Sequence, residues 1–103
     1  MLVNRDGTGV TNFRRSAQDP EVVALAALGF LAGEPERLVR FLALSGMTPQ
    51  DLRERAGEPV LLAAVLDHLL ADESLLFEFA EAEAMHPAEV GAARRKLPGG
   101  ETT

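Results

Sequence analysis

The chain of 103 residues contains no cysteine, tryptophan or tyrosine and only five phenylalanines. Without cysteine it cannot form disulfide bonds, thiolate metal sites or cysteine nucleophiles. So few aromatic side chains also argue against the stacking surfaces that bind single-stranded nucleic acid. Basic residues are scarce as well: 10 against 16 acidic residues give a net charge of −6. Because phosphate backbones are bound by basic surfaces, we do not expect nucleic acid to be a partner.

Long apolar runs are also missing. The longest uncharged apolar stretch covers residues 22–32, whereas a membrane-spanning helix needs about 20 residues. The N-terminus carries Arg5, Asp6 and Gly7 where a secretory signal would need an apolar run. We therefore expect a cytoplasmic protein with no membrane segment. Nine of the ten basic residues are arginine, which is typical of a bacterium with a GC-rich genome.

Proline, glycine and capping residues divide most of the chain into helical segments. Strict alternation of apolar and polar residues never lasts five positions, so no strand is expected. The caps and prolines predict six helices, at residues 20–32, 35–45, 49–56, 59–71, 73–84 and 87–97. We expect one helical domain over residues 19–97, with a mobile arm at residues 1–18 and a mobile tail at residues 98–103.

The helical region contains an internal repeat. A shift of 38 residues places residues 20–57 on residues 58–95 without a gap and aligns eight identical residues, where this composition would give about three by chance. Each copy has a long apolar helix, a helix with a Leu-x-x-Phe stripe that ends in Phe41 or Phe79, and a Met-x-Pro motif that opens a short helix. The sequence predicts an all-α fold, a compact six-helix bundle of two three-helix repeats related by a pseudo-twofold axis. The alternative is two similar helical hairpins without a common origin.

Three motifs resemble a known family. They are RFLALSG at residues 40–46, DLR at residues 51–53 and AVLDHLLADE at residues 64–73. They are similar to those of a family of small alphaproteobacterial proteins that is catalogued as a domain of unknown function. The resemblance covers about residues 20–98. It implies an all-helical fold and supplies no catalytic residue.

Acidic residues are concentrated in the second repeat. Residues 20–57 have a net charge of −1 and residues 58–95 of −6, and residues 72–89 hold six acids and no base. Glu78, Glu81 and Glu89 are candidates for one acidic face that docks a basic partner. The alternative is a solvated surface that keeps the protein soluble. No motif brings two carboxylates together with a general acid, so we expect no catalytic residue and no enzyme activity.

The two histidines are the other candidates for chemistry. His68 is the repeat counterpart of Phe30, and with Asp67 it forms the polar pair of an apolar helix. This pair is a candidate polar site, and the alternative is a histidine at the edge of the core. His86 opens the sixth helix, where we expect it to cap or to face water. Neither histidine has a second histidine three or four residues away, so we predict no metal and no cofactor.

The sequence favours a non-catalytic helical protein-interaction module, with a homodimer left open. A small-ligand carrier or sensor with a crevice near His68 is the alternative function. A DNA-binding regulator ranks third, because residues 37–56 resemble a helix-turn-helix pair. The second helix of that pair mixes Asp51 and Glu54 with Arg53 and Arg55, so it has no clear positive face.

Overall fold

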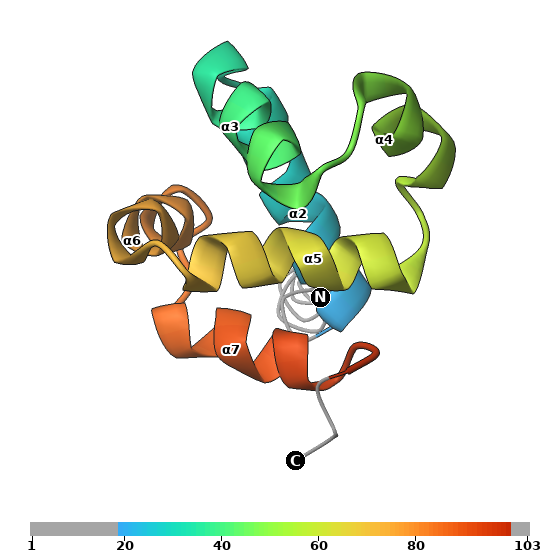
Figure 1. Cartoon of the computed structure of the whole chain (residues 1–103). Helices are drawn as coiled ribbons and strands as arrows, with labels where there is room; N and C mark the ends of the chain where they lie inside the picture. Colours follow the sequence, from blue (N-terminus) through green and yellow to red (C-terminus); the bar gives the residue numbers. More distant parts are fainter. Residues whose placement is uncertain (1–18, 100–103) are drawn as a thin grey trace, which may run out of the picture.

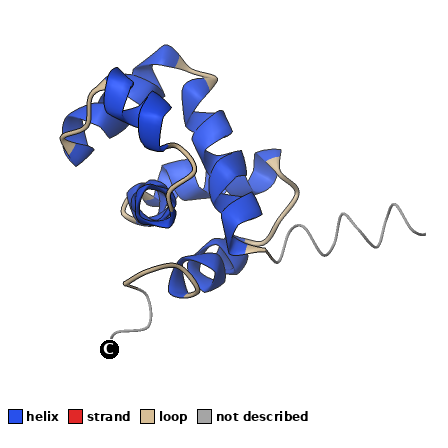
Figure 2. Cartoon of the chain, turned by 90° about the vertical axis from the view of Figure 1, so that its right-hand side faces the viewer, coloured by secondary structure: helices blue, strands red, loops and turns tan. Residues whose placement is uncertain are grey.

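The structure is a computed structural model that describes residues 19–99. In this range it contains six helices and no strand (Figures 1 and 2). They are α2 (Pro20–Ala32), α3 (Pro35–Ser45), α4 (Pro49–Arg55), α5 (Pro59–Leu70), α6 (Glu73–Ala82) and α7 (Pro87–Arg95). The all-helical prediction is confirmed, and each helix boundary lies within two residues of its predicted place. The predicted arm at residues 1–18 lies outside the described residues, as do residues 100–103 of the predicted tail.

Local chemistry fixes where the helices begin. Five of the six start with proline at the first position, where the missing N–H has no helical partner. The Thr48 hydroxyl accepts from the Asp51 N–H at 3.0 Å, and the Asp51 carboxylate accepts from the Thr48 N–H at 3.1 Å. The hydrogen bond from the Thr48 N–H is the main cause that lowers the pKa of Asp51, and the interaction with the Thr48 side chain lowers this pKa further. His86 caps α7 as expected, because its Nδ1 accepts from the Ala88 N–H at 3.1 Å.

The ends of α3 and α6 depend on a left-handed residue. Gly46 ends α3 with φ of 78°. Its repeat counterpart, Ala84, follows α6 with φ of 55°, the one non-glycine residue with positive φ in the described range. The Met85 N–H bonds to the Ala80 carbonyl at 2.9 Å, and the Ala84 N–H bonds to the Glu81 carbonyl at 3.2 Å. This pair of bonds forms a Schellman motif, which ends α6 two residues earlier than predicted.

The core is built around α2 and α5, which pack against each other. In Figure 1, α5 crosses in front of α2, with α3 and α7 on opposite sides of it. These two helices supply most of the buried apolar side chains. The flanking helices α3 and α6 add Phe41 and Phe79, which are 1% and 0% exposed. The predicted burial of both phenylalanines is confirmed.

Parts of the two predicted repeats correspond in the structure. The Phe30 and Phe79 rings pack edge to face, with centroids 5.4 Å apart. Their counterparts, His68 and Phe41, form the same kind of contact at 5.2 Å. Replacing each residue of the Phe30–Phe79 contact by its repeat counterpart gives the His68–Phe41 contact. A twofold axis that relates the two units requires this equivalence.

The correspondence does not extend to the third helices. α7 packs against both α2 and α5 and buries Val90 and Ala93. α4 buries no residue and lies at the edge of the molecule (Figure 1). The counterpart of Ala93 is Arg55, an exposed charged residue that cannot enter an apolar core. The structure therefore does not confirm the pseudo-twofold relation of the complete three-helix units.

Candidate functional site

His68 lies on the side of α5 that faces α3. Its ring packs edge to face against Phe41. Its Nε2 is buried without a hydrogen-bond partner, the one such side-chain atom found in residues 19–99. Burial lowers the pKa of His68, the positive charge of Arg40 lowers it further, and the negative charge of Asp72 opposes both. The pKa of His68 therefore lies below its usual value of 6.5, and the imidazole stays neutral to a lower pH than a free histidine does.

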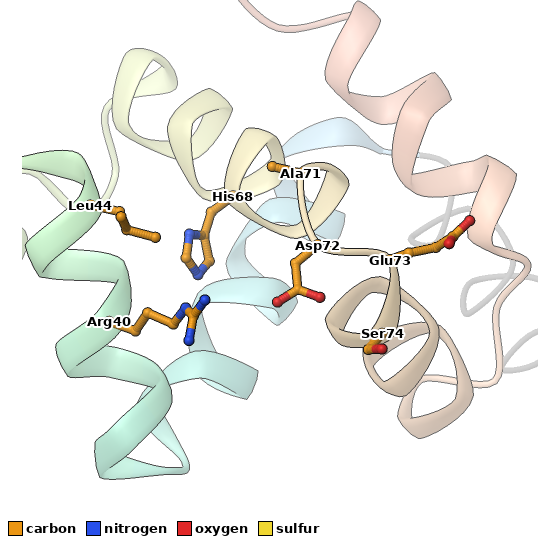
Figure 3. Close-up of a pocket in the computed structure, with 7 residues that line it drawn as sticks. All are labelled: Arg40, Leu44, His68, Ala71, Asp72, Glu73 and Ser74. Atoms are coloured by element: carbon orange, nitrogen blue, oxygen red, sulfur yellow. The ribbon is translucent and has the colours of Figure 1, made fainter.

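A surface crevice of about 360 Å³ opens beside this histidine. Arg40 and Leu44 of α3 form one wall, and the turn into α6 forms the opposite wall. In Figure 3, the side chains of Arg40, His68 and Asp72 point toward a common space, while Glu73 and Ser74 point away from it. The crevice thus gathers a cation, a neutral imidazole and a carboxylate at one place.

Asp67 does not join His68 in this crevice. Its carboxylate accepts from Arg94 Nε at 2.6 Å and from Arg94 Nη2 at 3.2 Å. Arg94 Nη1 also donates to the Pro98 carbonyl at 2.9 Å. Asp67 therefore ties α5 to the end of α7, and the predicted polar pair divides into a structural residue and a crevice residue.

The three predicted acidic residues also divide. Glu78 accepts from Arg37 Nη2 at 2.9 Å, and the Arg37 guanidinium lies over the Phe30 ring, 4.2 Å from its centroid. Phe30, Arg37 and Glu78 line a shallow hollow beside α6, and Glu81 lines it too. Glu89 lies on α7, where it accepts from the His86 N–H at 3.2 Å in a capping box. The structure brings Glu78 and Glu81 together and gives Glu89 a local role in helix capping.

An exposed aromatic residue on α6 was not among the predicted site residues. Phe77 is 52% exposed, and Glu73 and Glu81 lie one turn before and one turn after it on the same exposed face. The helical period offered a signal for this placement. With Leu76, Phe79 and Ala80 facing the core, position 77 lies about 100° from Leu76, at the side of the buried stripe.

Residues 19–99 contain no helix with the length and apolar character needed to cross a membrane. Within the same range, no three His, Asp or Glu side chains form a group that could hold a metal ion.

The fold and the crevice define a small all-helical domain. The chain belongs to the family described as "Protein of unknown function (DUF3572)", whose family model matches residues 17–100. This match confirms the resemblance to a domain of unknown function. No curated protein and no solved structure matches the chain.

Proposed function

We propose that this protein is a non-catalytic interaction module that binds a basic protein partner through one face of α6. We call this surface the α6 face and define it by Glu73, Phe77 and Glu81. The observation that carries the proposal is the exposure of Phe77, at 52%, between two exposed carboxylates. Aromatic side chains are enriched at protein interfaces, where they anchor the partner.

The charge around Phe77 specifies the chemistry of the partner. Arg37 pairs with Glu78, but none of the ion pairs in the described part of the chain includes Glu73 or Glu81. The face therefore keeps a net negative charge around an apolar centre. Such a surface attracts a segment in which basic residues surround an apolar side chain. A second copy of this chain carries the same negative charge, so repulsion disfavours a homodimer through this face.

We also propose that the two units, residues 20–57 and 58–95, arose by duplication. It is supported by the two equivalent ring contacts and by the shared left-handed ends at Gly46 and Ala84. Under this relation Val39 is the counterpart of Phe77 and is also exposed, at 64%. The positions one turn before and after Val39 are Pro35 and Ala43, which carry no charge. The acidic surround is thus specific to α6, and α3 offers an internal control.

The test compares four immobilised baits in a lysate of the native host. They are the wild type, Phe77→Ser, Glu73→Gln/Glu81→Gln, and Val39→Ser as the matched control. All the substitutions are at exposed positions, so each is expected to change stability by no more than about 0.5 kcal/mol. We expect one partner to be retained by the wild type and by Val39→Ser and lost from the other two baits.

The retained partner is then purified and titrated against the wild type. We expect its affinity to fall steeply as the salt concentration rises, because exposed charges are screened beyond about 8 Å at physiological ionic strength. Identical partner lists from all four baits, or an affinity that does not change with salt, would contradict the proposal.

A further inference from the structure

The crevice beside His68 holds two unlike charges that do not neutralise each other. Arg40 projects from α3, and Asp72 projects from the opposite wall (Figure 3). Neither residue takes part in any of the ion pairs within residues 19–99. One carboxylate oxygen of Asp72 accepts from the Leu75 N–H at 3.2 Å, and its second oxygen has no such bond. The two charged groups are therefore available to a molecule placed between them.

His68 adds a third group that lacks a partner. Its Nε2 is buried without a hydrogen bond, although buried polar atoms in proteins are nearly always satisfied. Leaving such an atom unpaired costs free energy. The ring itself lines the crevice, so its NMR signals report a ligand placed between the two charges.

The repeat counterpart of this crevice is a hollow in which the charged groups pair with each other. Phe30, Glu78 and Ala82 line the hollow on α6, and they are the repeat counterparts of His68, Arg40 and Leu44. In the hollow, Arg37 covers the Phe30 ring and forms an ion pair with Glu78 at 2.9 Å.

The same arrangement cannot form in the crevice, because the counterpart of Arg37 is Leu75. Leu75 has no charge, so it cannot form an ion pair at this position as Arg37 does with Glu78. In the hollow the cation is therefore paired within the protein, while the crevice keeps its ring nitrogen and its guanidinium without partners.

We propose that the crevice binds a small zwitterion, a compound of the amino-acid class with one carboxylate and one ammonium group. The carboxylate pairs with the Arg40 guanidinium, and the ammonium pairs with Asp72. The volume of about 360 Å³ lies at the lower end of the range for ligand sites, which suits a small molecule. Leu44, which is 69% exposed, supplies an apolar contact. This site does not involve Phe77 and does not depend on the proposed function of the α6 face.

The test uses three probes of equal chain length and one shorter zwitterion. The probes are 4-aminobutyrate, which has both charges, butyrate and butylamine, which each have one, and alanine, in which the two charges lie closer together. Each is titrated into the full chain while the NMR signals of the His68 ring are followed. We expect saturable shifts with at least one zwitterion, and an affinity at least about tenfold above that of butyrate or butylamine, or about 1.4 kcal/mol.

Variants assign the binding to the crevice. Arg40→Gln and Asp72→Asn are each expected to weaken the zwitterion about tenfold or more, toward the single-charge probes. Asparagine caps helices as well as aspartate does, so Asp72→Asn preserves the start of α6. Arg37→Gln, in the hollow on α6, is the matched control and is expected to leave the affinity unchanged. Circular dichroism confirms that each variant is folded.

Three results would overturn the proposal. The first is the absence of a saturable shift with both zwitterions at millimolar concentrations. The second is butyrate or butylamine binding as tightly as the better zwitterion. The third is an affinity that stays the same in Arg40→Gln or in Asp72→Asn.

Discussion

Replacing His68 by phenylalanine tests how the crevice residue contributes to stability. The variant removes the unpaired Nε2, and an unsatisfied buried polar atom costs about 1–3 kcal/mol. The new ring would face Phe41 as Phe30 faces Phe79, an edge-to-face contact that the fold already accommodates at 5.4 Å. Because His68 is only partly buried, we take the lower end of this range. We expect His68→Phe to raise the free energy of unfolding by about 1 kcal/mol.

The same variant has a signature in the pH dependence of stability. Burial and Arg40 lower the pKa of folded His68 below its usual value of 6.5. As the pH falls through 6.5, the unfolded chain therefore takes up this proton before the folded chain does. Proton uptake by the unfolded state lowers the stability. We expect the wild type to lose stability as the pH falls below 6.5, and His68→Phe to lose less.

Urea unfolding followed by circular dichroism, repeated between pH 8 and pH 5, measures both effects. His68→Gln is the matched control, because it removes the titrating group but keeps a polar side chain at the edge of the core. We expect it to flatten the pH dependence without the gain in stability. The reasoning would be refuted if His68→Phe destabilised the protein at pH 8, or if its pH dependence matched that of the wild type.

The remaining predictions concern the core and the helix ends. Phe41→Ala and Phe79→Ala should each lower the free energy of unfolding by about 3–5 kcal/mol, because both rings are fully buried; a loss within about 0.5 kcal/mol, typical of surface sites, would contradict this. Ala84→Gly should stabilise the protein by about 0.5–1 kcal/mol in the same urea assay, because a left-handed alanine is strained by more than the added glycine entropy costs. Gly46→Ala should destabilise it by about 1 kcal/mol through the backbone alone, since a Cβ there meets no atom within 4 Å. Opposite signs at these two positions would show that the left-handed conformation does not control these helix ends.

The starts of the helices were predictable because their signals are local. Asp19, Thr48 and Asp72 each cap the residues that directly follow them. The burial of Phe41 and Phe79 followed from a helical stripe, which also needs only a few neighbouring residues. The end of α6 was predicted two residues too late, because the alanine at position 84 gives little indication of a left-handed turn.

The make-up of the sites was harder to predict because it depends on tertiary packing. Asp67 and His68 are adjacent in the sequence, but neighbouring residues of a helix point about 100° apart. One therefore faces α7 and the other faces α3. The crevice joins residues of α3 to Asp72 across the bundle, and no spacing in the sequence measures that proximity. The packing of α7 against both central helices was likewise absent from the repeat pattern.

Photocrosslinking at the centre of the α6 face tests the proposed docking most directly. Benzoylphenylalanine is placed at position 77 in one protein and at the counterpart position 39 in another, and both are irradiated in a lysate of the native host. We predict a covalent adduct from position 77 alone, with a partner segment that carries a net positive charge. Equal adducts from both positions, or a position-77 adduct with an acidic or uncharged segment, would contradict a basic partner at Phe77.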